Sequence, residues 1–88
     1  MTPFESFASE EFWDLYLLLP TAARRAADKQ FALFTHDPFH ASLLLKPVGP
    51  FWSVRITRAS RALALRREDE FLWFWIGAHD EYERLLVG

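Results

Sequence analysis

The chain has 88 residues, enough for one hydrophobic core, because a chain of this size buries only roughly 60% of the surface that it exposes when unfolded. Hydrophobic residues make up 51% of it, and the absence of cysteine excludes disulfides and thiolate metal sites. The first eleven residues hold three glutamates and neither a basic residue nor an apolar run, and no apolar run approaches the ~20 residues of a membrane span. We therefore expect a single cytoplasmic domain, residues 1–88, that crosses no membrane.

The formal net charge of −2 hides an uneven distribution of charge. Most of the carboxylates lie in residues 5–14 and 68–83, whereas residues 46–67 contain none. A local basic patch can bind phosphate even on an acidic protein, although solvated cations on an exposed sheet face would give the same pattern. The cations of this central segment are Lys46, Arg55, Arg58, Arg61, Arg66 and Arg67.

The first predicted element is a helix that begins after Ser9. Serine is a favourable N-cap, and Glu10 and Glu11 suit the positive end of the helix dipole. Pro20 should end this helix. Its apolar residues recur at spacings of three and four, as a helix with one buried face requires: Phe12, Trp13, Tyr16 and Leu17.

A second helix should follow at once, with Thr21 as its N-cap and its end near Phe34. Because the connection is so short, the two helices should form an antiparallel hairpin. The apolar stripe of the second helix consists of Ala23, Ala27, Phe31 and Phe34.

The remaining elements are predicted to be strands and a last helix. Residues 51–57 alternate between apolar and polar, which predicts a half-buried strand, and 61–67 should form the next one. Residues 71–76 are apolar on both faces and should form a central strand covered on both sides, while 42–47 could add an edge strand. With a short C-terminal helix near 80–86, the predicted fold is α+β: an N-terminal helical hairpin packed on a small antiparallel sheet of three to four strands.

Several short motifs occur along the chain in a characteristic order. They resemble the pattern of the RelE/ParE superfamily of toxin–antitoxin toxins, over about residues 12–86. The N-terminal strand that is usual in this superfamily is poorly marked here, and Ser60 stands where many relatives carry a larger residue. The motifs are Leu19-Pro20, His36-Asp37-Pro38-Phe39-His40-Ala41-Ser42-Leu43, Trp52-Ser53-Val54-Arg55-Ile56, Arg61-Ala62-Leu63 and Trp75-Ile76-Gly77-Ala78-His79-Asp80-Glu81-Tyr82.

The resemblance implies a small toxin that an antitoxin holds inactive. RelE-like members enter the ribosomal A site and cleave messenger RNA, whereas ParE-like members inhibit DNA gyrase. The function that we expect is therefore that of a type II toxin acting as a ribosome-dependent mRNA endoribonuclease (an mRNA interferase). A gyrase inhibitor or a catalytically inactive binding module of the same fold are the alternatives. The expected partners are the cognate antitoxin, the ribosome and mRNA, in a homodimer or a hetero-oligomer with the antitoxin.

Cleavage of RNA without a metal requires a base for the ribose 2′-hydroxyl, cations for the charge on the phosphate and an acid for the leaving oxygen. His79 is the candidate base or acid because imidazole titrates near neutral pH, although it could instead cap a helix. Arg61 and Arg55 should lie on neighbouring strands and hold the phosphate, unless Arg55 forms a surface ion pair. Tyr82 could stack on a base or donate its hydroxyl, and packing against the sheet explains it equally well.

The other cations of the central segment are candidates for binding RNA phosphates. Lys46, Arg58, Arg66 and Arg67 could each neutralise a phosphate, and a solvated side chain is the alternative for each. His36 and His40 flank a loop, but no third ligand is marked nearby. We therefore expect no metal and no cofactor.

Overall fold

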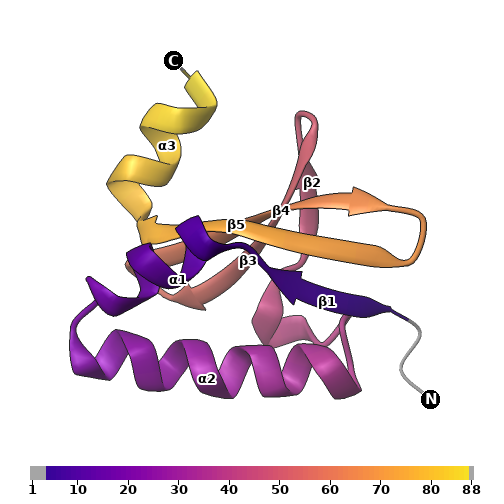
Figure 1. The fold of residues 1–88 in the computed structure, drawn as a ribbon, viewed down its shortest axis with the longest axis horizontal. Helices are drawn as coiled ribbons and strands as arrows, with labels where there is room; N and C mark the ends of the chain where they lie inside the picture. The colour runs from indigo at the N-terminus through magenta and orange to yellow at the C-terminus, as the bar shows by residue number, and fades with distance from the viewer. Residues whose placement is uncertain (1–3, 88) are drawn as a thin grey trace.

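The computed structural model describes residues 4–87 and shows a sheet with helices on both faces (Figure 1). The sheet has five strands in the order β1-β5-β4-β3-β2, and only the β1–β5 pair is parallel. The helices α1 and α2 cover one face, and α3 rises from the other (Figure 1). In chain order the elements are β1 (Glu5–Ala8), α1 (Glu10–Leu17), α2 (Thr21–His36), the 3₁₀ helix η1 (Ala41–Leu43), β2 (Lys46–Val48), β3 (Phe51–Thr57), β4 (Ser60–Arg67), β5 (Glu70–Ala78) and α3 (His79–Val87).

The predicted fold class is confirmed, with a difference at the N-terminus. The strand β1 precedes the helical hairpin and pairs in parallel with β5, so the sheet is mixed and has one strand more than expected. All but the last of its four residues are exposed, and its partner lies more than sixty residues further along the chain. A strand so short and so exposed carries little of the alternation from which strands are predicted.

The helical hairpin forms as expected, with a correction at the start of α2. Ser9 caps α1, since its Oγ accepts a hydrogen bond from the backbone N–H of Phe12 at 3.2 Å. Thr21, however, is the first residue of α2 rather than its N-cap. The N-cap is Pro20, whose carbonyl accepts from the N–H of Arg24 at 3.0 Å, and the helix continues to His36.

Aromatic side chains fill the core between the hairpin and the sheet. Phe34 of α2 is 2% exposed and contacts the rings of Phe71 and Trp73 edge to face, at centroid distances of 5.2 and 5.5 Å. Phe12 of α1 meets Phe31 of α2 at 5.6 Å, so the helices contact each other as well as the sheet. The buried residues of β3 on this face are Val54 and Ile56, as the alternation predicted.

The opposite face of the sheet is only partly covered. The helix α3 packs on β4 and β5, but Leu65 and Leu72, at the other end of these strands, remain 46% and 40% exposed. The expectation that β5 is covered along both faces is therefore wrong for this end, because a helix of nine residues spans only ~14 Å. In the described part of the chain, no helix is long and apolar enough to cross a membrane.

Candidate active site

Two arginines face each other on the side of the sheet that carries α3. Arg55 of β3 and Arg61 of β4 are register partners, so their side chains project from the same face. Both are half-buried. Gln30 of α2 holds the β3 backbone here, since its Nε2 donates to the carbonyl of Arg55 at 2.8 Å. Like charges placed directly opposite each other cost stability, and within residues 4–87 neither arginine has a carboxylate partner within 4.0 Å.

Arg61 also holds the turn between β3 and β4. Its Nη1 donates to the carbonyls of Thr57 at 2.6 Å and Ser60 at 2.9 Å. Burial lowers the pKa of Arg61 and the neighbouring Arg55 lowers it further, while Tyr82 partly offsets both effects. The same guanidinium thus shapes a turn and contributes to a site of concentrated positive charge.

His79 lies at the junction of β5 and α3, and the turn that Arg61 holds fixes its backbone. Its N–H donates to the carbonyl of Ala59 at 2.7 Å. Its side chain is 36% exposed, and Nδ1 lies 3.2 Å from a carboxylate oxygen of Glu83, one helical turn further along α3. A carboxylate at this distance favours the tautomer that carries its proton on Nδ1, and that tautomer leaves Nε2 as the nitrogen that can accept a proton.

Tyr82 lies beneath His79. The two ring centroids are 5.6 Å apart, and Tyr82 is only 7% exposed. Its hydroxyl donates to Oγ of Ser53, which is 1% exposed, over 3.5 Å. This burial favours packing over stacking on a base as the role of Tyr82.

Gly77 of the terminal motif has a steric role. It lies opposite Arg61 in the register. A Cβ at this position would lie 2.7 Å from the ring of Trp75, so a side chain here would displace the indole. Glycine therefore allows the aromatic ring and the arginine to share this part of the sheet.

The six predicted cations do not form one surface. Lys46 is exposed on β2 opposite Ser53, on the arginine side of the sheet, and Arg58 is exposed in the turn beside His79. Arg67 lies at the far end of β4, opposite Glu70. Arg66 lies on the other face, where its guanidinium carbon is 4.8 to 5.4 Å from the ring centroids of Phe4, Trp52 and Phe71.

The structure therefore brings together the four predicted catalytic residues and separates part of the predicted phosphate-binding set. Residues 4–87 contain no cluster of three or more potential metal ligands, and Nδ1 of His40 accepts a hydrogen bond from the N–H of Ser42 at 3.2 Å. Sequence reasoning did not identify Ser53 and Glu83 as parts of the site. The spacing of Glu83 four residues after His79 could have indicated it, whereas only the packing of α3 on the sheet reveals Ser53.

Comparison with known proteins identifies the fold. No protein-family model matches the sequence, and no curated protein matches it significantly in sequence. YafQ from E. coli has a TM-score of 0.71 at 9% identity, with 90% of this chain and 97% of that chain covered. A chain of the toxin–antitoxin complex RelBE2 from Mycobacterium tuberculosis scores 0.69 at 14% identity, covering 88% and 99%. The YoeB/ParE toxin from Agrobacterium tumefaciens scores 0.66 at 15% identity, covering 86% and 99%. The chain therefore has the fold of the RelE/ParE toxins.

Proposed function

We propose that this chain is the toxin of a type II toxin–antitoxin system and cleaves messenger RNA on the ribosome, with Arg55 and His79 as its principal catalytic residues. The observation that carries the proposal is the pair of arginines on adjacent strands, without a carboxylate partner within residues 4–87, beside an oriented histidine. Such a pair is costly for the fold alone and becomes favourable when an anion binds between the two cations.

The cleavage step needs a proton acceptor, a cationic clamp and a proton donor for the leaving oxygen, and in this proposal water is the donor. Nε2 of His79 takes the proton of the ribose 2′-hydroxyl, the 2′-oxygen bonds to phosphorus, and the bond from phosphorus to the 5′-oxygen breaks. The 5′-oxygen then takes a proton from water, the hydroxide that remains takes the proton from His79, and the other product is a 2′,3′-cyclic phosphate. The guanidinium of Arg55 stabilises the negative charge that grows on the phosphate oxygens during this step.

The other candidate residues support this pair. Arg61 binds the same phosphate with the part of its guanidinium that does not hold the turn, and it adds positive charge next to Arg55. Tyr82 supports the ring of His79 from below. Lys46 and Arg58 border the site and are suited to bind the neighbouring phosphates of the RNA.

The proposal includes the partners and the place of action. An antitoxin should hold the chain inactive, as the complex RelBE2 among its structural neighbours suggests. The ribosome presents the mRNA, which places the activity in the cytoplasm.

The test is expression of the chain without a partner, followed by primer extension on cellular mRNAs. Growth should stop, and the mRNAs should be cut within translated codons, while purified RNA without ribosomes is cut poorly. Growth arrest with intact transcripts would contradict the proposal, and inhibited DNA supercoiling in the same cells would point to gyrase.

One observation favours a catalytically inactive binding module as the second candidate. Nη1 of Arg61 is engaged by backbone carbonyls, and Tyr82 is buried, so only His79, Arg55 and the remaining part of the Arg61 guanidinium can approach RNA without rearrangement. The two candidates are separated by ribosome-dependent cleavage with purified protein, which only the toxin performs.

A further inference from the structure

The strand β1 has an open backbone edge. The N–H of Glu5 donates to the carbonyl of Asp69 at 2.8 Å, and the N–H of Ser9 donates to that of Trp73 at 3.0 Å. These two bonds determine which residues of β1 direct their backbone groups toward β5. The backbone groups of residues 5, 7 and 9 therefore point toward β5, whereas the N–H and C=O groups of Ser6 and Ala8 point away from it. Since β1 is the last strand of the sheet, these groups form a ready template for another strand.

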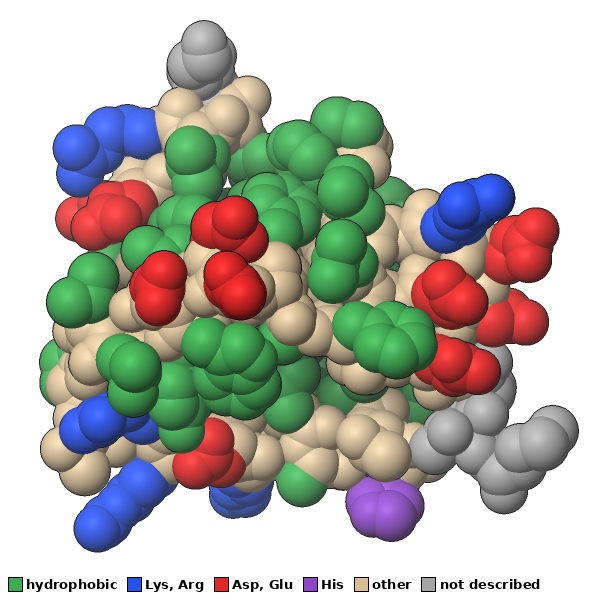
Figure 2. Space-filling model, viewed as in Figure 1, with side chains coloured by type: hydrophobic (Ala, Val, Ile, Leu, Met, Phe, Trp, Pro, Cys, Tyr) green, Lys and Arg blue, Asp and Glu red, His purple; other side chains and the backbone are tan. Residues whose placement is uncertain are grey.

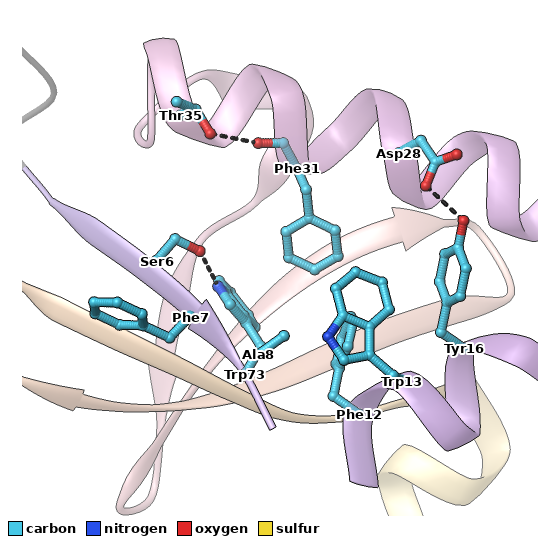
Figure 3. Close-up of a pocket in the computed structure, with 10 residues that line it drawn as sticks. All are labelled: Ser6, Phe7, Ala8, Phe12, Trp13, Tyr16, Asp28, Phe31, Thr35 and Trp73. Atoms are coloured by element: carbon cyan, nitrogen blue, oxygen red, sulfur yellow. Dashed lines mark hydrogen bonds between the residues drawn. The ribbon is translucent and has the colours of Figure 1, made fainter. Parts of the chain in front are cut away.

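A hollow of about 370 Å³ lies beside this edge, between β1 and the helical hairpin. Figure 3 shows Phe31 and Trp13 projecting into it from α2 and α1, with Trp73 on the side of the sheet. The Nε1 of Trp73 already donates to Oγ of Ser6 at 2.9 Å. The hollow therefore offers mainly aromatic surface, which suits an apolar side chain.

A second hollow, of about 290 Å³, extends the first along β1. The two share Ser6, Phe7 and Thr35 as lining residues, so together they form one groove along the open edge. Figure 2, which views this side of the molecule, shows apolar side chains and carboxylates in the middle of this face and the lysine and arginine side chains toward its borders.

The charge of the groove is negative. Its lining residues include the carboxylates of Asp28 and Glu5 and neither lysine nor arginine. Asp28 accepts a hydrogen bond from the hydroxyl of Tyr16 at 2.7 Å, and this bond raises the pKa of Tyr16. A ligand that fills the groove should therefore carry positive charge as well as an apolar group.

We propose that β1 and this groove bind an extended, basic segment of a partner protein by strand addition. The backbone of the segment pairs with Ser6 and Ala8, one apolar side chain enters the hollow at Trp73, and lysine or arginine residues lie opposite Asp28 and Glu5. Backbone pairing supplies affinity in this mode, and the pocket for alternate side chains supplies specificity. The groove is independent of the proposed active site, because β5 and β4 separate β1 from Arg55 by roughly 14 Å of sheet.

The test uses the full chain and a blocked seven-residue peptide with the sequence Lys-Val-Thr-Leu-Thr-Val-Lys. Hydrogen exchange measured by NMR should slow at least about tenfold at the amides of Ser6 and Ala8 when the peptide binds. The amides of Phe7 and Ser9 should not change, because they already bond to β5. The peptide with glutamate in place of both lysines, and one N-methylated at alternate residues, should bind at least about tenfold more weakly.

A matched pair of variants locates the binding site on the protein. Thr35→Trp should fill the groove and weaken binding at least about tenfold, whereas Ala32→Trp, exposed on the same helix outside the groove, should leave binding unchanged. No binding at about 1 mM peptide, or binding without protection of Ser6 and Ala8, would overturn the proposal. So would concentration-dependent protection of both amides without peptide, since a second copy of the chain would then occupy the edge.

Discussion

The two ends of β4 carry arginines in contrasting surroundings. At the start of the strand, Arg61 faces Arg55 and lies close to His79 and α3. At its end, Arg66 lies over aromatic rings on the helix-covered face, and Arg67 stands opposite Glu70. One end therefore concentrates positive charge, whereas at the other end Arg66 packs on aromatic rings and Arg67 lies opposite an acidic residue in the register.

Strand geometry explains this difference. Alternation turns Arg66 toward the face opposite Arg61, and Arg67 lies six positions further along the strand than Arg61, which is roughly 20 Å. The alternation of side chains between the two faces and the length of the strand thus divide a group of cations that lie close together in the sequence. The consequence is that only substitutions at the start of β4 should affect activity, whereas a substitution of Arg66 at its end should affect stability alone.

The largest expected effect is that of His79→Ala on cleavage. Loss of a positioned proton-transfer group should reduce the rate of ribosome-dependent cleavage by about 10²–10⁴-fold. The rate is measured with purified protein and programmed ribosomes, and urea unfolding checks the fold. His36→Ala, which removes an exposed histidine at the end of α2, is the matched control and should keep the wild-type rate. A folded His79→Ala protein that cleaves normally would remove the basis of the proposed mechanism.

A slightly smaller effect is expected for Arg55→Ala. This variant tests whether the paired arginines at the start of β4 contribute more to cleavage than the cation at its end. Loss of a preorganised charge donor should reduce the cleavage rate by about 10²–10³-fold. Arg67→Ala removes the same charge from the other end of the predicted basic segment and should leave the rate unchanged. Equal losses in the two variants would show that overall charge, rather than the paired arginines, determines the activity.

Arg61→Lys should affect stability as well as activity. Lysine keeps the charge but cannot reproduce the forked contacts of Nη1 with the carbonyls of Thr57 and Ser60, so we expect roughly 1–3 kcal/mol lower free energy of unfolding. Hydrogen exchange at the amide of His79 should become faster, because the turn that holds it loosens. Unchanged exchange at this amide would contradict the role of Arg61 in the turn.

The smallest effect is expected for Arg66→Ala. Loss of its contacts with the aromatic rings should lower the free energy of unfolding by about 1 kcal/mol, as measured by urea titration. The cleavage rate should remain that of the wild type, because this side chain lies on the face opposite the proposed site. A marked loss of cleavage in a stable Arg66→Ala protein would instead place RNA on the helix-covered face.

The amino-acid sequence by itself determined most of the secondary structure and predicted four candidate catalytic residues. Ser9 predicted the start of α1 because capping is a local interaction, and alternation predicted β3 with its bounds. The four candidate catalytic residues came from the resemblance and from their chemistry. The tertiary structure shows that these residues lie together on the face of the sheet that carries α3.

Only the tertiary structure decided the features that depend on distant parts of the chain. It paired β1 with β5, buried Tyr82 against Ser53 and placed the carbonyl of Ala59 against the amide of His79. The separation of Arg66 from Arg61 could have been predicted from the alternation of β4, but the rings that Arg66 contacts come from β3, β5 and the segment before β1. Local patterns record which residues favour a helix or a strand, whereas contacts between residues far apart in the sequence depend on how those elements pack together.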